Sequence, residues 1–437
     1  MDIIIAGAGR VGFRLAKTLC TKHNVTVIDQ NEDALNRLQE SIDILAIVGN
    51  IENPKTYDML IDRESDLFIA VTDMDETNII STLIADETIR VKEKIIRLRN
   101  DFFAKSSISK RLGITASVFP FYLSANSVKL LLDFPKANNV KRFNHCEQKL
   151  ISVRATSSIS LEEIISNRVK VVGIERDREF FIPNIYETTQ RDDLVYFFGN
   201  EQDIRELCLK LEPQMPTDIQ NIVIFGADML GVEIATLLSK YNVHIKIIEK
   251  DIQKCKKASN VLQENVTVIN SKYGEHHLFK EENLENADML IATSKNDEEN
   301  IIKCLEAKEH KIKKVVAINN DLEHYHLMHK LGIIAVRGPK TNAYYSILEK
   351  ISSSSIVNQR KYCGGKGVLM SRKIHKNSPL LDTEIKPLNI PNSCSFIIKN
   401  EKIEDFDKKF EVNEGDVILA FGSNEDTDKI EKWINSL

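Results

Sequence analysis

The sequence lacks several features that would assign it at once to a class of protein. No apolar run approaches the roughly 18 residues that a membrane-spanning helix needs. No basic block stands out and the net charge is −5, so nucleic-acid binding has little support. The N-terminus, MDIII, has no basic region followed by a small-residue cleavage site, and we expect no secretory signal. With 437 residues, 42% hydrophobic, the composition is that of a soluble globular protein of two to four domains.

Motifs for metal binding and catalysis are also scarce. The 7 cysteines are scattered and never in C-x-x-C spacing, which indicates reduced thiols and argues against a structural zinc site. The chain has no nucleophile elbow, no H-E-x-x-H and no Walker lysine. The histidines of HYHLMH (His324, His326, His329) and GEHH (His276, His277) are interpreted as ordinary surface or core residues, with metal binding as the less favoured alternative. We therefore predict no catalytic residue and no metal site.

The most informative feature present is an internal repeat. IIIAGAGRVGFRLAKTLCTKHNVTVIDQNED near the N-terminus matches IVIFGADMLGVEIATLLSKYNVHIKIIEKDI in the second half. Five landmarks recur at a steady offset: Gly7 and Gly226, Asp29 and Glu249, Asn78 and Asn300, Gly113 and Gly332, Asp193 and Asp416. This indicates duplication of a unit of about 220 residues.

Each unit divides again. Its first part alternates apolar runs with amphipathic stretches, the pattern of a parallel sheet covered by helices on both faces. In the first unit we expect strands near 2–6, 25–29, 44–48, 67–71, 94–98 and 116–119, with helices beginning near 10, 31, 54, 75 and 101. An apolar helix between Pro120 and Pro135 (121–134, with 342–351 as its counterpart) precedes a smaller module of short β runs (about 149–212 and 366–437).

The predicted fold class is therefore α/β: a duplicated Rossmann-like parallel-sheet lobe, each copy followed by a small α+β C-terminal lobe. The expected segments are a first large lobe (1–119), a crossover helix (120–137), a first small lobe (138–215), a second large lobe (216–338), a crossover helix with linker (339–365) and a second small lobe (366–437). Linkers are expected at EPQMPTD (212–218), SSSS (352–355) and CGGKG (363–367). The last is interpreted as a hinge rather than a phosphate loop, because Lys366 is not followed by Ser or Thr.

The glycine run GAGRVG has the setting of a dinucleotide-binding motif, since a strand precedes it, a helix follows and an acid closes the next strand. Gly7 would permit the tight turn, Gly9 would let a pyrophosphate approach the backbone, and Gly12 would let the helix sit close to the strand. The helix N-terminus offers free N–H groups to the phosphates. Asp29 would bind a ribose 2′-OH and repel a 2′-phosphate, which favours NAD(H) over NADP(H). A glycine turn without a ligand is the alternative.

The second copy departs from this pattern. GADMLG keeps Gly226 and Gly231 but has Asp228, with a side chain and a negative charge, at the middle position. Glu249 still closes the strand. We expect this site to be empty or to bind a different nucleotide weakly.

VTDMDETN in the first unit supports the first site. Thr72 ends a predicted strand, at the edge where open α/β sheets bind ligands. Helix capping is an equal alternative, since Thr72-x-x-Asp75 and Asp73-x-x-Glu76 have capping-box spacing, and Ser294 and Asp297 repeat the first pair.

The whole chain resembles the TrkA-type regulatory subunits of bacterial Trk potassium uptake, which carry two RCK units (regulators of potassium conductance). The resemblance rests on GAGRVG, VIDQNED, DLFIAVTDMDETNI and IIRLRN, and on the order large lobe, small lobe, large lobe, small lobe. It implies a cytoplasmic, non-catalytic subunit on the inner face of the cell membrane that binds NAD(H), with ATP or ADP as further ligands. It also implies a homo-tetramer or other ring docked on a potassium-translocating membrane subunit of the TrkH/TrkG type.

Site residues follow from the motifs that carry the resemblance. The cofactor-binding residues expected in the first lobe are Gly7, Ala8, Gly9, Arg10, Val11, Gly12, Asp29, Gln30, Gly49, Asn50, Thr72, Asp73 and Arg97. Those of a weaker second site are Gly226, Ala227, Asp228, Met229, Leu230, Gly231 and Glu249. Two departures stand out, because Gly49-Asn50 replaces the family's usual Gly-Asp and the second unit has NSKYGEHH there.

The leading hypothesis is thus a nucleotide-sensing regulator that controls potassium flux through a separate membrane protein. Two alternatives remain open at this point. One is an NAD-dependent oxidoreductase that uses a small lobe as its substrate domain. The other is a scaffold whose Rossmann-like lobes have lost their ligands, which the three glycines and Asp29 of the first unit count against.

Overall fold

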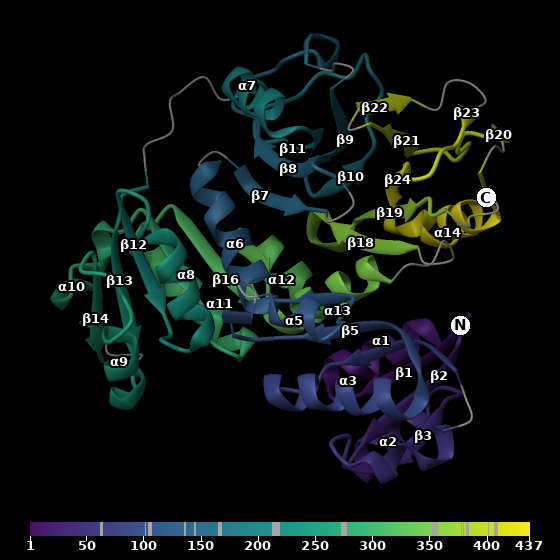
Figure 1. Ribbon diagram of the computed structural model, residues 1–437. Helices are drawn as coiled ribbons and strands as arrows, with labels where there is room; N and C mark the ends of the chain where they lie inside the picture. The colour runs from purple at the N-terminus through teal and green to yellow at the C-terminus, as the bar shows by residue number, and fades with distance from the viewer. Residues whose placement is uncertain are drawn as a thin grey trace. The chain divides into compact units, whose positions relative to one another are not determined.

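The structure is a computed structural model, and the chain divides into two compact units (Figure 1). It describes residues 1–61, 64–100, 102–103, 107–134, 137–143, 146–164, 168–211, 219–271, 278–351, 357–376, 378, 380–381, 384–400, 402–405 and 410–437. The first unit comprises residues 1–124 and 338–351, and the second comprises residues 125–337 and 352–437.

The first unit contains a parallel six-stranded sheet of order β3-β2-β1-β4-β5-β6. Its strands are β1 (Asp2–Ala6), β2 (Asn24–Asp29), β3 (Leu45–Val48), β4 (Ser65–Ala70), β5 (Val91–Arg97) and β6 (Ala116–Val118). Its helices are α1 (Arg10–Leu19), α2 (Glu32–Gln39), the 3-10 helix η1 (Pro54–Leu60), α3 (Asp75–Ile89), α5 (Ile108–Arg111) and α13 (Pro339–Lys350). The strand order reverses between β1 and β4, which creates the crevice where doubly wound sheets bind ligands.

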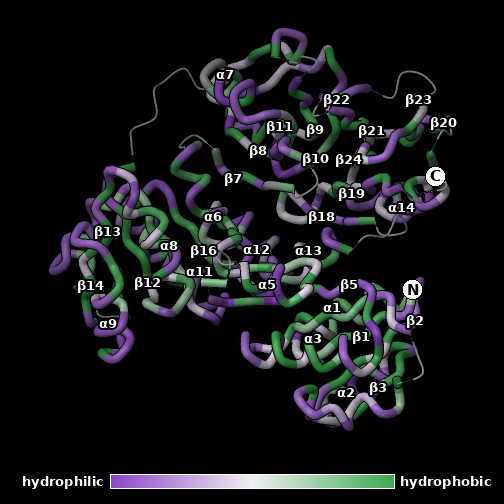
Figure 2. Tube along the Cα trace, in the orientation of Figure 1, coloured by the Kyte–Doolittle hydropathy of each residue, from purple (hydrophilic) through white to green (hydrophobic). Residues whose placement is uncertain are grey.

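Hydrophobic periodicity accounts for these elements. The central strands are apolar along their length because helices cover both faces of a parallel sheet, and they are among the hydrophobic stretches in Figure 2. Helix α1 buries Val11, Leu15 and Leu19 at i, i+4 spacing and leaves Lys17 exposed. The six strands predicted from the sequence are confirmed within a few residues. The helix expected at 54 is a 3-10 helix, and the one expected at 101 begins on a residue outside those described.

Helix α13 packs on the first large lobe although it lies more than 300 residues further along the chain. The Arg14 guanidinium carbon lies 4.2 Å from the centre of the Tyr344 ring. The hydroxyls of Thr18 and Tyr344 are hydrogen bonded at 2.8 Å. The predicted crossover stretch 342–351 is therefore a helix, and it rests along α1.

The second unit repeats the large lobe with strand order β14-β13-β12-β15-β16-β17, again fully parallel. Its strands are β12 (Asn221–Phe225), β13 (His244–Glu249), β14 (Val266–Asn270), β15 (Met289–Ala292), β16 (Lys314–Asn319) and β17 (Ile334–Arg337). Its helices are α8 (Met229–Leu238), α9 (Ile252–Ser259), α10 (Leu278–Glu281), η3 (Leu284–Asn286), α11 (Asp297–Glu309), η4 (Leu322–His324) and α12 (Tyr325–Lys330). The other predicted crossover helix is α6 (Pro120–Asp133).

Two antiparallel sheets form the small lobes, of order β10-β9-β11-β8-β7 and β18-β19-β24-β21-β22. The first has β7 (Ala137–Arg142), β8 (Lys149–Arg154), β9 (Val169–Arg176), β10 (Glu179–Phe181) and β11 (Leu194–Gly199), with η2 (Leu161–Glu163) and α7 (Glu201–Leu211). The second has β18 (Asn358–Tyr362), β19 (Gly367–Lys373), β21 (Ser393–Lys399), β22 (Lys402–Asp405) and β24 (Val417–Ser423), with η5 (Cys363–Gly365), η6 (Asn424–Asp426), α14 (Thr427–Ser436) and the short pair β20 (Glu384–Ile385) and β23 (Phe410–Glu411).

The two small lobes share one aromatic core. Tyr196 and Phe198 of the first contact Tyr362 and Phe421 of the second, with ring centres 5.2 and 5.3 Å apart in the pairs Tyr196–Tyr362 and Phe198–Phe421. The Tyr362 hydroxyl donates a hydrogen bond of 2.6 Å to the Val172 carbonyl. This continuous core holds the small lobes together as one body within the second unit.

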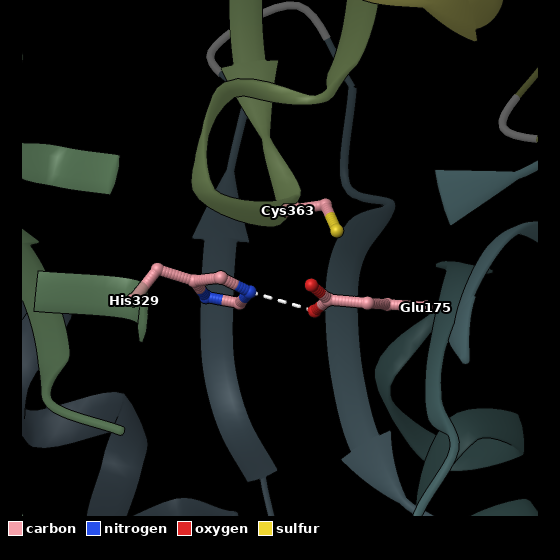
Figure 3. A group of neighbouring side chains, drawn as sticks. All are labelled: Glu175, His329 and Cys363. Carbon is pink, nitrogen blue, oxygen red and sulfur yellow. Dashed lines mark hydrogen bonds and ion pairs between the residues drawn. The ribbon is translucent and has the colours of Figure 1, made fainter. Parts of the chain in front are cut away.

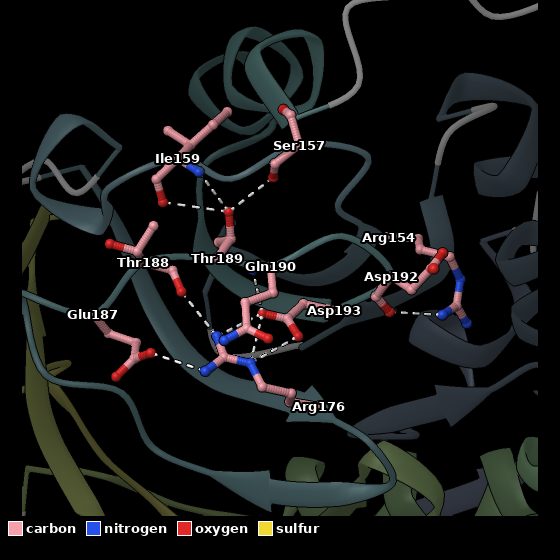
Figure 4. Close-up of polar contacts among 10 residues, drawn as sticks. All are labelled: Arg154, Ser157, Ile159, Arg176, Glu187, Thr188, Thr189, Gln190, Asp192 and Asp193. Carbon is pink, nitrogen blue, oxygen red and sulfur yellow. Dashed lines mark hydrogen bonds and ion pairs between the residues drawn. The ribbon is translucent and has the colours of Figure 1, made fainter.

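The repeat extends to a polar turn in each small lobe. The Asp193 carboxylate accepts a hydrogen bond from the backbone of Gln190, and Asp416 accepts the same bond from Asn413. In the first small lobe Arg176 adds an ion pair of 2.8 Å to Asp193 and one of 3.0 Å to Glu187 (Figure 4). The landmark pair Asp193 and Asp416 therefore reflects the same turn built twice.

One predicted linker needs correction. CGGKG is a tight turn between the paired strands β18 and β19, so the second small sheet begins at Asn358 and not at residue 366. The turn is possible because Gly364 and Gly365 adopt positive φ angles of 60° and 94°. The predicted linkers 212–218 and 352–355, Pro135, and the histidines of GEHH lie outside the described residues.

Candidate functional site

The first glycine loop lies at the point where the strand order of the first sheet reverses. It connects β1 to α1, and Thr72 follows β4, the neighbouring strand. A Cβ atom at Gly7 would stand 3.3 Å from the Thr72 nitrogen, so the two loops touch. The carboxyl edges of β1 and β4 thus bring the predicted residues of GAGRVG and VTDMDETN together.

The first and third glycines are required by the fold itself. Gly7 has φ +112°, and a Cβ atom at Gly12 would stand 1.8 Å from the Gly7 carbonyl oxygen. The second loop is built alike, because Gly226 has φ +113° and a Cβ atom at Gly231 would stand 1.9 Å from the Gly226 oxygen. These four glycines therefore let each helix start close against its strand, whether or not a ligand binds.

The middle glycine is different, because nothing in the fold requires it. A Cβ atom at Gly9 would meet no atom within 4 Å, and its φ of −66° suits any residue. Gly9 is the N-cap of α1, where no side chain satisfies the free N–H groups of the first turn. This exposed, uncapped helix start is the arrangement that binds phosphate groups.

Asp29 fastens the glycine loop to the end of β2. Its carboxylate accepts hydrogen bonds from the Ala8 nitrogen at 2.6 Å and the Asn31 nitrogen at 2.8 Å. The side chain is half-buried, so its remaining lone pairs face a region open to solvent. Arg10 and Gln30 are exposed beside it, and Val11 is buried in the first turn of α1.

The second glycine loop likewise has an acid at the end of the second strand but differs at the position of the middle glycine. Glu249 accepts hydrogen bonds from the nitrogens of Ala227 and Asp251, both at 2.9 Å, and is only 2% exposed. Asp228 occupies the position of Gly9 and forms an ion pair of 2.6 Å with Lys254 of α9. Met229 is 46% exposed and Leu230 is buried. A carboxylate and its lysine partner thus stand where the first loop is open.

Asn78 of α3 organises the loop after β4. Its amide oxygen accepts hydrogen bonds from the Thr72 nitrogen and hydroxyl, at 2.9 and 2.7 Å. Its amide nitrogen donates to the Thr72 and Arg97 carbonyls. Asn300 makes the corresponding bonds to Ser294 and Ile318. This role of the asparagine was not predicted from the sequence. The recurrence of Asn78 as Asn300 in the second unit could have indicated it.

Arg97 is placed beside Asp73 at the end of β5. The guanidinium is almost fully buried and donates to the Asp73 carboxylate at 3.0 Å. Burial lowers the pKa of Arg97, and the neighbouring Asp73 carboxylate partly offsets this. At the corresponding positions the second lobe has Asn319 and Lys295, so it does not repeat the ion pair.

The capping interpretation of this loop is wrong in its details. The N-cap of α3 is Met74, and no side chain caps it. Asp75 instead accepts hydrogen bonds from the backbone nitrogens of Arg99 and Asn100, each at 2.8 Å. This carboxylate joins α3 to the end of the neighbouring strand β5.

Gly49 and Asn50 have local structural partners. A Cβ atom at Gly49 would stand 2.6 Å from the Thr56 side chain, and the Asn50 side chain accepts a hydrogen bond of 2.9 Å from the Glu52 nitrogen. The asparagine thus closes a turn after β3. Its part in ligand binding stays a prediction.

Among the residues that the structure describes, no helix is long and apolar enough to cross a membrane.

Two parallel-sheet lobes with glycine loops at the strand-order reversal, each followed by an antiparallel lobe, define a tandem Rossmann-like protein of the RCK type. The GsuK RCK domain superposes with a TM-score of 0.61 at 14% sequence identity, and the match covers 100% of this chain and 95% of that one. The structure titled GsuK channel bound to NAD superposes with a TM-score of 0.60, also at 14% identity, and the match covers 100% of this chain and 79% of that one. These likenesses confirm the predicted fold class.

Sequence comparison places the chain in a family. The TrkA-N domain matches twice, at residues 3–120 and 222–339, so the chain belongs to the TrkA-N family. The Trk system potassium uptake protein TrkA homolog 1 of Methanosarcina mazei is 24% identical, over 99% of this chain and 100% of its own. The Trk system potassium uptake protein TrkA of Halomonas elongata is 26% identical, over 96% and 95%. The predicted membership is confirmed.

Proposed function

We propose that the first large lobe binds NAD(H) and that this binding controls potassium uptake. The observation that carries the proposal is the contrast between Gly9 and Asp228. Gly7 and Gly12 are retained in both loops because the fold needs them, whereas Gly9 has no structural need and is nevertheless glycine only in the first loop. A pyrophosphate lying against the backbone supplies the missing reason.

Asp29 supports NAD(H) over NADP(H). Its carboxylate is tied to the Ala8 nitrogen, at the start of the loop that would hold the pyrophosphate, and it remains half open to solvent. A ribose 2′-OH would donate to it, whereas a 2′-phosphate would be repelled. ATP and ADP share the adenosine and phosphates, so they are competing ligands for the same loop.

The potassium function rests on the relatives. Those of Methanosarcina mazei and Halomonas elongata are named potassium uptake proteins, and each matches nearly the full length of this chain. By analogy this chain is a non-catalytic regulatory subunit that docks on the inner face of a TrkH/TrkG-type potassium-translocating membrane protein. The similar channel structure titled as bound to NAD fits a ligand of this class.

Assembly into a homo-oligomeric ring is supported by a repeated apolar surface. Ile80 and Leu83 on α3 are 44% and 37% exposed. Ile302 and Leu305 take the same positions on α11 and are 54% and 36% exposed. Two exposed apolar side chains one turn apart, present in both lobes, suit helix packing between subunits.

The test is a titration of the full chain with NADH, NADPH, ATP and ADP, followed by calorimetry or by NADH fluorescence. We expect NADH to bind about tenfold or more tightly than NADPH. The proposal fails if neither NADH nor an adenine nucleotide binds. Turnover of NADH with a small metabolite would favour the oxidoreductase alternative instead.

Two further measurements address the partner and the ring. Potassium flux through a membrane subunit reconstituted with this chain is expected to change on adding NADH. Light scattering on size exclusion is expected to show a multimer that the pair of substitutions Ile80→Glu and Leu83→Glu breaks. A monomeric native chain would refute the ring.

A further inference from the structure

Three ligand-type side chains converge in the second unit, away from both glycine loops. Glu175 comes from β9 of the first small lobe, His329 from α12 of the second large lobe and Cys363 from the turn η5 of the second small lobe. Their ligand atoms all lie within 4.8 Å of one another, and Figure 3 shows the three side chains facing a common point. Sequence spacing could not indicate this cluster, because three separate segments contribute to it.

The surroundings hold these side chains in place. His329 Nε2 lies 2.7 Å from a Glu175 carboxylate oxygen. A Cβ atom at Gly364 would stand 2.7 Å from the His329 ring, so the glycine turn that carries Cys363 lies directly against the imidazole. The Cys363 side chain is almost fully buried, whereas Glu175 and His329 are 12% and 16% exposed. The cluster therefore opens to solvent on the side of the carboxylate and the imidazole.

We propose that Glu175, His329 and Cys363 form a zinc-binding site that links the two small lobes to the second large lobe. Thiolate and imidazole ligands select Zn²⁺ over Mg²⁺ and Ca²⁺, and three protein ligands leave a fourth, open position for water. Zinc ligands 2.0–2.3 Å from the ion stand about 3.5 Å from one another. The three ligand atoms, all within 4.8 Å, can reach this spacing if the thiol moves inward while His329 Nε2 and the Glu175 oxygen, now 2.7 Å apart, separate. Binding releases the Cys363 thiol proton to solvent and requires the His329 Nε2 proton to move to Nδ1 or, from a doubly protonated ring, to solvent. The hydrogen bond between His329 and Glu175 is then replaced by two metal bonds.

Lys366 would compete with the metal. Its ammonium group lies 2.5 Å from the second Glu175 oxygen, and it also donates to the Arg178 carbonyl. The lysine and His329 are therefore the partners of this carboxylate in the metal-free protein. A cation entering the cluster must displace or tolerate this positive charge, which makes zinc binding weaker than it would be without the lysine.

The site would have a mechanical consequence. Its three ligands come from three lobes of the second unit, so a bound ion would fix the position of α12 relative to both small sheets. Because such a metal binds the folded arrangement and not the unfolded chain, it should stabilise this unit. The inference does not depend on nucleotide binding, since none of the three residues belongs to a glycine loop.

The experiment is a titration of the full chain, stripped with a chelator, with Zn²⁺ and with Co²⁺ as a spectroscopic probe. We expect one equivalent of metal, a thiolate-to-cobalt charge-transfer band and a higher melting temperature. Cys363→Ser should abolish the band and weaken Zn²⁺ binding at least about 100-fold. Lys366→Met should strengthen it about tenfold or more, because it removes a competing charge.

Matched controls separate this site from adventitious binding. Cys20→Ser replaces a half-buried cysteine of the first unit, and His324→Gln replaces a histidine that instead contacts Asp297 and Glu298. Both should bind Zn²⁺ like the native chain. The proposal is overturned if the native chain binds no metal at micromolar concentration, if the cobalt complex lacks the thiolate band, or if Cys363→Ser binds as tightly as Cys20→Ser. Circular dichroism confirms that each variant is folded.

Discussion

The most direct test of the nucleotide site is to give the first loop the residue of the second, by the substitution Gly9→Asp. A Cβ atom at position 9 meets nothing within 4 Å, and the backbone there suits any residue. Asp228 already occupies the equivalent position with nearly the same φ and ψ angles. We therefore expect the free energy of unfolding to change by no more than about 0.5 kcal/mol.

Binding should change far more than stability. The new carboxylate would lie beside a pyrophosphate, and one pair of like charges about 5 Å apart repels by about 1 kcal/mol in water and about 3 kcal/mol near a protein surface. The first lobe has Ala34 at the position of Lys254, so no lysine would neutralise the new charge. NADH affinity should fall between about fivefold and about 200-fold.

Gly9→Ala serves as the control that separates charge from size. It adds a methyl group without a charge, so it should weaken NADH binding less than Gly9→Asp does. Because salt screens the repulsion between charges, raising the salt concentration should reduce the difference in NADH affinity between the two variants. Calorimetric titration with NADH and thermal melting of the three proteins supply the measurements. The reasoning is refuted if Gly9→Asp binds NADH as the native chain does, or if it loses binding only because it has unfolded.

Three further predictions concern the framework of the fold. Gly12→Ala should lower the free energy of unfolding by about 3 kcal/mol or more in chemical denaturation, because its Cβ atom would stand 1.8 Å from the Gly7 oxygen. Tyr344→Ala should lower it by about 2 kcal/mol, because it removes the contact with Arg14 and the hydrogen bond to Thr18. Burial lowers the pKa of Lys314 from 10.5 to about 7, so between these pH values the unfolded chain binds more protons than the folded one. The free energy of unfolding should therefore rise with pH across this window, by up to about 1.4 kcal/mol per pH unit. Denaturation curves of Lys314→Met recorded over the same pH range should lack this rise.

Each of these three predictions would be contradicted by a specific result. A Gly12→Ala variant as stable as Gly9→Ala would show that the close approach of α1 to β1 is unimportant. Native stability in Tyr344→Ala would mean that α13 does not hold α1. For Lys314, the same pH dependence in the native and Lys314→Met proteins would assign the titration to another group.

The parallel sheets were predictable because their chemistry is local. A strand covered on both faces needs an unbroken apolar run, as in DIIIA and NIVIF, and each run is followed by glycines that only a tight strand-to-helix turn explains. The internal repeat also helped, because equivalent positions of the two units, such as Gly12 and Gly231, could be compared. The structural roles of the glycines in the strand-to-helix loops could therefore be predicted from the sequence.

Contacts between distant segments were not predictable. The packing of Tyr344 on Arg14 joins residues more than 300 positions apart, and neither residue is unusual for an amphipathic helix. The same holds for His329, whose neighbours in the sequence indicate only a short helix, while its partner Glu175 lies on another lobe. Such contacts depend on how elements dock, and periodicity carries no information about docking.

Helix α1 connects the proposed nucleotide site to α13. Its first turn would hold the pyrophosphate, while Arg14 and Thr18, further along the same helix, hold Tyr344. Because Gly9, Arg14 and Thr18 lie along one helix, a shift of α1 driven by a ligand at Gly9 would also move its contacts with α13. A ligand can drive such a shift only through different affinities for two positions of the helix. Helix α13 comes from the second half of the duplicated sequence but belongs to the first compact unit, so a shift of α1 driven by a nucleotide would reach a segment of each half.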